Sequence, residues 1–279
     1  MGSSVAAGTE STSTTPPGSA RASQAARDLF LAHERLALGS LGLALLLVAW
    51  EIGSATRVLN PIIFSSPTGI VRAAGREVQS GAIWHHLGVS ALELVLGFVL
   101  AALLGVVVGF IAGWWRRANA LLDPWITILY NLPTVALMPL IILVMGIGLW
   151  SKVFVVFLIT LFPIVVNTMI GVQNTARTLI DVARTLGASP RRQWRTVVIP
   201  GATPFILTGL RLAGGRALIG VVVAELIAGN EGIGFALHYA GSLLQAGTVM
   251  LYILILGFSG VLFAEVLRRI EDRFESWRP

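Results

Sequence analysis

Few residues of this chain are of a type that could carry out covalent chemistry or hold a cofactor. The 279 residues include no cysteine and only one lysine, Lys152, which follows Ser151 rather than the glycine that a nucleotide-binding P-loop requires. Thiolate catalysis and cysteine-based metal sites are therefore excluded. The histidines show no metal-ligand spacing, and we interpret all of them as structural or interfacial: His33, His85, His86 and His238. We predict no catalytic residue, no metal and no cofactor, so ATP-driven work would need the ATPase of a partner.

One serine lies in a short motif that would fit an enzyme. Gly257-Phe-Ser-Gly260 matches the Gly-x-Ser-Gly sequence of the rhomboid family of intramembrane serine proteases. Such chemistry needs a histidine base beside the serine, and in rhomboids this base comes from a later helix. Every histidine here precedes Ser259. A protease is therefore a disfavoured alternative.

Ionisable residues within apolar stretches are the other candidates for function. Arg211 and Arg216 lie in such a stretch, where an arginine at mid-bilayer costs about 2.5–3.5 kcal/mol. Five positions correspond to about 140° around a helix, so the two side chains cannot share one narrow face. One of them could attract an anionic substrate. The interpretation that we favour is structural pairing, with Glu93 and Glu225 as the available carboxylates.

The composition indicates where these residues must be positioned. Hydrophobic residues make up 55% of the chain and charged residues only 12%, against about 25% charged in a soluble domain. The mean hydropathy is +0.81, and the charges lie in clusters between long apolar runs. Soluble enzymes, disordered proteins and nucleic-acid binders are poor candidates. The sequence predicts an all-α, multi-pass protein whose main partner is the lipid bilayer.

Six stretches are long enough to cross a bilayer, which takes about 20 apolar residues. We place the helices near 36–54, 88–113, 124–147, 152–173, 203–227 and 246–267. With a cytoplasmic N-terminus, fourteen arginines fall on the cytoplasmic side, and three arginines and the lysine fall outside. This bias predicts that both termini are cytoplasmic and that the protein lies in the cell membrane.

The N-terminal segment differs in composition from the rest. Residues 1–19 are dominated by Ser, Thr, Pro and Gly, so we predict a disordered cytoplasmic tail over 1–28 and a membrane domain over 29–279. An extended signal peptide over 1–55 is the alternative. Residues 67–79 are amphipathic and are interpreted as an interfacial helix.

The connection between the fourth and fifth predicted spans contains a recognisable pattern. Apolar residues recur at helical spacing from Leu179 to Leu186, and Gly187 then ends that helix. Ser189 is a candidate N-cap and Pro190 the first residue of a second helix, which Pro200 interrupts. Two short helices are thus predicted to meet at a tight cytoplasmic corner within segment 178–200.

This segment resembles the EAA loop of permease subunits of bacterial ABC importers. Asp181-Val182-Ala183 stands where the family has Glu-Ala-Ala, Gly187 follows in register, and Val197, Ile199 and Pro200 match the Ile-x-Leu-Pro end. The resemblance implies a type I permease fold and a coupling helix that is seated in a cleft of the ATPase. It implies ATPase coupling by Asp181, Val182, Ala183, Arg184, Gly187, Ala188, Ser189, Pro190 and Pro200.

The resemblance extends over residues 60–272. The segments 209–217, 223–226, 232–234 and 131–139 look like the subgroup that imports nitrate, sulfonates and taurine. The resemblance implies two ATPase subunits, a second permease copy in a homodimer, and an extracytoplasmic substrate-binding protein.

The third predicted span is a candidate for the translocation path. Pro133 and Pro139 each remove a backbone hydrogen bond from it. Candidate residues for the translocation path are Asn131, Pro133, Thr134, Met138, Arg211, Arg216 and Glu225.

A secondary transporter driven by an ion gradient is the nearer alternative function. It would need paired intramembrane acids or broken helices in corresponding halves of the chain. Acidic residues are sparse within the predicted spans, so the ATP-driven permease is preferred.

Overall fold

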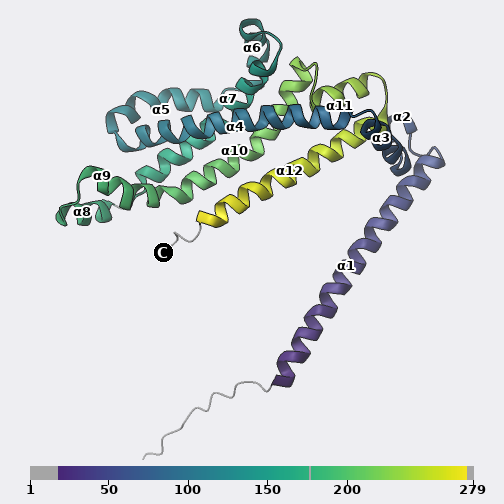
Figure 1. Ribbon diagram of the computed structural model, residues 1–279, viewed down its shortest axis with the longest axis horizontal. Helices are drawn as coiled ribbons and strands as arrows, with labels where there is room; N and C mark the ends of the chain where they lie inside the picture. Colours follow the sequence, from purple (N-terminus) through teal and green to yellow (C-terminus); the bar gives the residue numbers. More distant parts are fainter. Residues whose placement is uncertain (1–17, 176, 275–279) are drawn as a thin grey trace, which may run out of the picture. The chain divides into compact units, whose positions relative to one another are not determined.

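The computed structural model describes residues 18–175 and 177–274, and all the regular structure in these ranges is helical (Figure 1). The contacts divide the chain into two units, residues 1–58 and 59–279. The first unit contains α1 (Gly18–Ala55), of which Ala37–Ala55 is apolar enough to span a membrane. The predicted tail lies partly outside the described residues, at 1–17. Residues 18–28 form the start of α1; four of them are Ala and two are Arg, which favour helix.

The second unit contains the remaining helices. In chain order they are α2 (Pro61–Phe64), α3 (Pro67–Gln79), α4 (Ala82–Trp114), α5 (Arg116–Asn131), η1 (Thr134–Leu137), α6 (Met138–Met145), α7 (Leu149–Gln173), α8 (Arg177–Thr185), α9 (Pro190–Gln193), η2 (Trp194–Val198), α10 (Ile199–Ala228), α11 (Ile233–Ser242) and α12 (Ala246–Phe274). Among the described residues, five helices are long and apolar enough to span a membrane, or six if the bent α5–α6 pair counts as one. This agrees with the six predicted spans.

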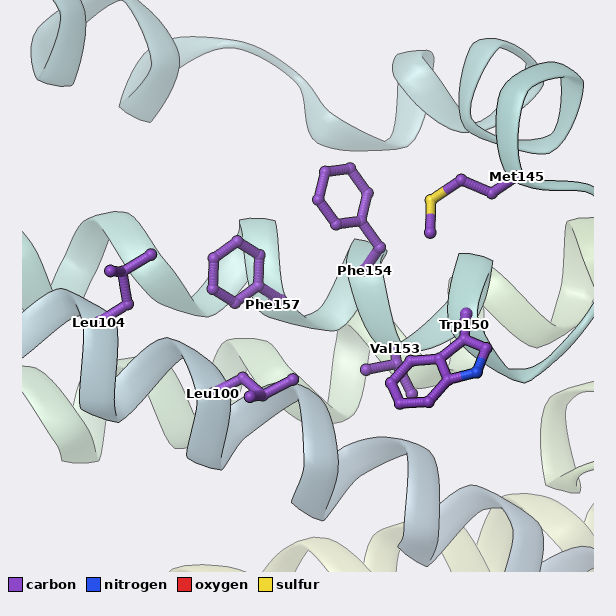
Figure 2. Close-up of a pocket in the computed structure, with 7 residues that line it drawn as sticks. All are labelled: Leu100, Leu104, Met145, Trp150, Val153, Phe154 and Phe157. Atoms are coloured by element: carbon purple, nitrogen blue, oxygen red, sulfur yellow. The ribbon is translucent and has the colours of Figure 1, made fainter.

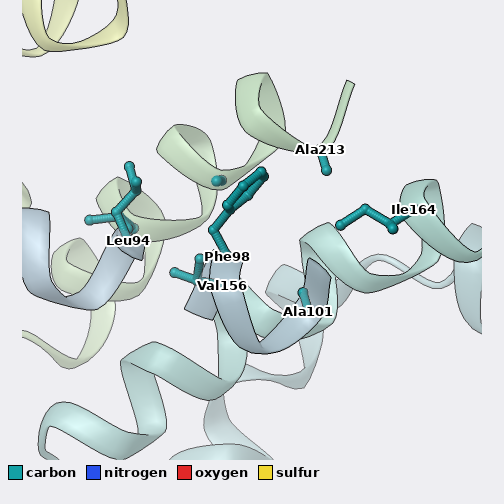
Figure 3. Close-up of a cluster of buried hydrophobic side chains, with 8 residues drawn as sticks. Leu94, Phe98, Ala101, Val156, Ile164 and Ala213 are labelled. Carbon is teal, nitrogen blue, oxygen red and sulfur yellow. The ribbon is translucent and has the colours of Figure 1, made fainter. Parts of the chain in front are cut away.

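The centre of this unit is formed by α4, α7 and α10, which lie side by side (Figure 1). Figure 3 shows the buried cluster between them, with Leu94 and Phe98 from α4, Val156 and Ile164 from α7, and Ala213 from α10. Phe98 also contacts Phe263 of α12, with the two ring centroids 5.5 Å apart. Side chains from three spans are thus packed into one apolar core.

Small residues at four-residue spacing allow α4 and α7 to approach closely. A Cβ atom at four glycines of α4 would lie 2.5–3.0 Å from a side-chain atom of α7, at Gly97, Gly105, Gly109 and Gly113. Lipid tails give no hydrophobic driving force between helices, so close backbone packing is what holds such a pair together. The glycine stripe therefore fixes the distance between these two spans.

We expect Gly109→Val to destabilise the protein. The new Cβ would lie 2.5 Å from Cβ of Thr168 and 2.7 Å from the backbone oxygen of Val165, and a backbone atom cannot move aside. Overpacking of this kind costs about 1–3 kcal/mol. The measurement is the thermal unfolding temperature in detergent. Gly88→Val on the same helix is the matched control, because no atom lies within 4 Å of its Cβ. Equal unfolding temperatures for both variants would contradict the expectation.

The third predicted span, 124–147, is not one helix. It begins earlier, at Arg116, and the axes of α5 and the η1–α6 segment differ by 86°. Pro133 lies at the break and cannot donate a hydrogen bond to the preceding turn. Pro139 occupies the first turn of α6, where no donor is needed. The two prolines therefore act differently, one breaking a helix and the other starting one.

The helix predicted over 67–79 is confirmed as α3. The Ser66 hydroxyl accepts a hydrogen bond from the backbone N–H of Gly69, at 3.0 Å, which caps the helix. Ile70 and Ala73 are buried, and Tyr252 of α12 donates to Glu77 at 2.8 Å. The inner face of α3 is thus packed and hydrogen-bonded against the spans.

Candidate functional site

The predicted corner in segment 178–200 is present and is formed by α8 and α9. Gly187 has φ +75°, a left-handed conformation that glycine adopts without strain. The backbone N–H of Ala188 donates to the carbonyl of Ala183, and that of Gly187 to the carbonyl of Arg184, both at 2.9 Å. These two bonds form a Schellman motif, which ends α8 at a defined direction.

The second side of the corner begins as predicted at Ser189 and Pro190. Ser189 is the N-cap residue, although its side chain makes no capping bond; its backbone carbonyl accepts from Arg192 and Gln193. Pro190 occupies the first turn of α9. The turn between α8 and α9 is therefore fixed by backbone bonds rather than by the serine hydroxyl.

Two residues that the sequence did not single out brace this corner. Gln193 is buried, and its side-chain amide donates to the carbonyl of Ala188 at 2.8 Å. The Trp194 ring packs against Trp114 at the end of α4, with centroids 4.9 Å apart, and against Phe110 at 5.6 Å. The Gln193 bond is local, whereas both Trp194 contacts join segments far apart in the sequence. The corner is thus attached to the membrane-spanning core through α4.

Pro200 does not interrupt the second helix, contrary to the sequence prediction. The helical path is continuous from Pro190 to Ala228, because residues 194–198 form a π-helical turn in which Ile199 donates to Trp194. This wider turn accommodates a residue that lacks an N–H and crowds the preceding carbonyls. The corner therefore continues directly into span α10.

The α8 helix presents an exposed apolar stripe. Exposed fractions are 57% for Leu179, 49% for Val182 and 81% for Leu186, the residue that follows the end of α8, and their spacing places them on one face. Ile180 instead packs inward against the cluster of Val172, Val198 and Ala202. Asp181 and Arg184 form an exposed pair at 3.6 Å, a type worth little stability. A hollow of about 560 Å³ beside them is lined by Trp114, Ile180, Asp181 and Arg184. Nothing among the described residues covers the stripe.

The two arginines of α10 have different partners. Arg211 pairs with Glu271 near the end of α12. Arg216 donates to the Tyr130 hydroxyl at 3.2 Å, and its guanidinium carbon lies 5.1 Å from the Tyr130 ring centroid. No carboxylate among the described residues pairs with Arg216. The expected pairing with Glu93 or Glu225 is wrong, because Glu93 pairs with Lys152 and Glu225 accepts bonds from Ser90 and Gly234.

The remaining candidate path residues fall into two groups. Asn131, Pro133 and Thr134 lie at the break between α5 and η1 and are exposed or half-buried. Met138 is fully buried in a cluster with Val155 and Ala224, and Glu225 is 1% exposed. The first group lies next to Tyr130, the partner of Arg216, whereas the second has no surface to offer a solute.

An apolar cavity of about 290 Å³ lies between α4 and α7, below Met145 (Figure 2). Leu100 and Leu104 of α4 face Trp150, Val153, Phe154 and Phe157 of α7 across it. No charged residue lines it, so it is not suited to an ionic solute. Among the described residues, no group of acids and histidines is arranged to hold a metal ion.

Comparisons with known proteins agree with this arrangement. Residues 101–277 match the model of the binding-protein-dependent transport system inner membrane component. The putative aliphatic sulfonates transport permease protein SsuC of Escherichia coli K12 is 36% identical, over 84% of this chain and 89% of that protein. The taurine transport system permease protein TauC of the same organism is 30% identical, over 87% and 89%.

Two solved structures share the fold. The inward-facing MetNI methionine ABC transporter covers 72% of this chain and 96% of its own, with TM-score 0.52 and 18% identity. An amino acid ABC transporter with histidines covers 67% and 92%, with TM-score 0.55 and 16% identity. At these identities the likeness concerns the fold alone.

Proposed function

The chain belongs to the family of binding-protein-dependent transport system inner membrane components, and on this premise we propose that it forms the translocation path of an ABC importer for a small anionic solute. It is a multi-pass cell-membrane protein. Membership of this family favours ATP-driven uptake over transport driven by an ion gradient. ATP hydrolysis is assigned to separate ATPase subunits, as the lack of a P-loop requires.

The observation that carries the proposal is the exposed apolar stripe of α8 on a rigid corner. Leaving three large apolar side chains in water is unfavourable, because burying each of them would contribute about 1.5–3 kcal/mol. An apolar stripe of three residues fits a cleft in a partner, and the ATPase is the partner that must act on this end of the spans. We assign the residues from Asp181 to Pro200 to coupling, and the whole segment 178–200 to the cytoplasmic side.

The rigidity of the corner supports this assignment. Movement of the ATPase must reach the spans, and a flexible loop would absorb the displacement. The Schellman bonds at Gly187, the Gln193 brace and the continuous path from α9 into α10 would let the corner move as one body. The Trp194–Trp114 contact would carry the same movement to α4.

The solute class is proposed from Arg216. An arginine in the middle of an apolar span is not expected to face lipid, and this one has no carboxylate partner among the described residues. Its guanidinium beside Tyr130, next to Asn131 and the helix break, could receive an oxyanion by two parallel hydrogen bonds. The relatives SsuC and TauC are named for aliphatic sulfonates and taurine, solutes that carry such an oxyanion.

The proposed assembly contains two copies of this chain, two ATPase subunits and an external binding protein. The two permease copies would enclose the path between them, with Asn131, Pro133, Thr134 and Arg216 facing it. Both chain termini would be cytoplasmic, as the arginine distribution indicates. Met138 and Glu225 are not included in the path, because their side chains are buried.

We expect Leu186→Asp to weaken retention of the ATPase by at least about tenfold, because the exposed leucine loses about 1.5–3 kcal/mol of burial on docking. The measurement is the amount of ATPase that copurifies with the tagged permease from detergent. Thr178→Asp is the matched control, since it adds the same charge at the N-terminal turn of α8, where an acid is favourable, outside the stripe. Wild-type retention in Leu186→Asp would contradict the docking role.

A further inference from the structure

A connected polar cluster is buried at the other end of the core, where α10 ends and α11 begins. Glu93 of α4 and Lys152 of α7 form an ion pair with side chains 0% and 1% exposed. Glu225 of α10, also buried, lies beside the Glu93 carboxylate and accepts a hydrogen bond from Ser90 of α4 at 2.6 Å. Three spans are thus joined by buried ionisable side chains.

The same cluster holds the first turn of α11. The backbone N–H of Gly234 donates to Glu225 at 2.7 Å, that of Ile233 to the Ser90 hydroxyl at 2.8 Å, and that of Gly232 to Nδ1 of His86 at 3.1 Å. The first N–H groups of a helix have no partner within the helix. Here each of the three is satisfied by a side chain from α4 or α10.

The glycines of this turn are explained by the cluster. A Cβ atom at Gly232, where φ is +105°, would lie 2.1 Å from Oε1 of Glu225. At Gly234 it would lie 2.7 Å from the backbone oxygen of Val222. The Gly-Ile-Gly sequence therefore exists to let the backbone close around the carboxylate of Glu225.

The loop between α10 and α11 is attached to the cluster and also reaches the surface. Lys152 lies 3.5 Å from the backbone oxygen of Glu231, whose carboxylate contacts the exposed ring of His85 at 3.1 Å. A partner that binds at the exposed side of this loop would therefore displace groups that are bonded directly to α4, α7 and α10.

We propose that Glu93, Lys152, Glu225 and Ser90 form a lock that seats α11 and the loop 229–232 on the three central spans. When the external binding protein docks on this loop, the resulting movement is transmitted along the same helices to their ATPase end. The inference rests on the proposed function. Ser90 and Glu225 are positioning residues in it; they bond to the α11 backbone rather than to the solute.

The physical basis is that this cluster has little freedom to adjust. A buried ion pair that loses one member leaves an uncompensated charge, which is strongly unfavourable. A carboxylate that accepts bonds from both Ser90 and Gly234 fixes α4, α10 and α11 in one arrangement. The external loop and the spans should therefore move as one body rather than independently.

The test compares Ser90→Ala with Ser259→Ala in the complex of permease, ATPase and binding protein in lipid nanodiscs. A second apolar cavity, of about 420 Å³, lies between α4, α10 and α12 and is lined by both Ser90 and Ser259. Ser259 is the matched control because it makes no hydrogen bond among the described residues. Two quantities are measured: amide hydrogen exchange of residues 229–240, and ATP hydrolysis with and without binding protein loaded with taurine or butanesulfonate.

For Ser90→Ala we expect faster exchange at Ile233 and Gly234 and at least about a fivefold loss of stimulated hydrolysis. Basal hydrolysis should equal that of the control. Faster exchange with full stimulation would overturn the proposal, since the lock would then be structural only; unchanged exchange would overturn it as well. If Ser90→Ala does not assemble, Glu225→Gln is measured in the same way. Absent stimulation in wild type and control would instead refute the proposed function.

Discussion

Gly187→Val is expected to reduce binding-protein-stimulated ATP hydrolysis to the basal rate while the permease still inserts into the membrane. Gly187 has φ +75°, where a β-branched residue is strained by about 1–2 kcal/mol. To relieve this strain the chain would give up the two Schellman bonds that end α8. The direction of α8 relative to α9 would then be lost, and with it the rigid connection to α10.

This effect is one of backbone conformation alone. No atom of the described chain lies within 4 Å of a Cβ placed on Gly187, so the substitution creates no clash within this chain. Gly187→Asn is the matched control, because asparagine tolerates the left-handed region, and it should keep most of the stimulation. The measurement is hydrolysis by purified complexes with equal ATPase content. Wild-type stimulation in Gly187→Val would show that this corner does not couple.

The membrane-spanning architecture could be predicted from the sequence because lipid imposes a simple rule. Each span must be apolar over about 20 residues, and five of the six predicted segments coincide with single long helices. The third does not, because hydropathy indicates burial in lipid but not the direction of the helix axis. Pro133 and Pro139 both indicated a weakened helix, but prolines alone do not specify an 86° bend.

The candidate site was predictable where its geometry is local. Gly187 and Pro190 act on the neighbouring turns, so their sequence pattern was sufficient to place the α8–α9 corner. Trp194 was missed because its partner, Trp114, is defined by how distant segments pack. Gln193 was missed although its partner, Ala188, is only five residues away, because a side-chain bond to a loop carbonyl has no sequence signature. Pro200 was misread for the opposite reason: a π-helical turn, which sequence rules do not anticipate, lets the helix pass through it.

The pairing of the arginines required the structure. Arg211 and Arg216 look equivalent in the sequence, yet only Arg211 has an acidic partner among the described residues, Glu271. The favoured interpretation of structural pairing therefore suits Arg211, whereas the partner of Arg216 in the described part of the chain is Tyr130, through its ring and hydroxyl. The two positions can now be given different expectations.

Arg216→Gln is expected to lower uptake of an anionic solute by about 10- to 100-fold, because loss of a charged hydrogen bond costs about 1.5–3 kcal/mol. The measurement is uptake of labelled taurine and butanesulfonate by proteoliposomes containing the full complex. Arg211→Gln is the matched control, an identical change five positions away on the same helix, and should transport within about twofold of wild type.

Two further variants separate charge from geometry at this position. Arg216→Lys keeps the positive charge but loses the planar fork and the stacking on Tyr130, so intermediate uptake is expected. Tyr130→Phe keeps the ring and removes only the hydroxyl that accepts at 3.2 Å, so its effect should be small. If charge alone attracts the solute, Arg216→Lys will equal wild type. Normal uptake by Arg216→Gln would mean that this arginine is structural, and the anionic solute class would lose its support in this chain.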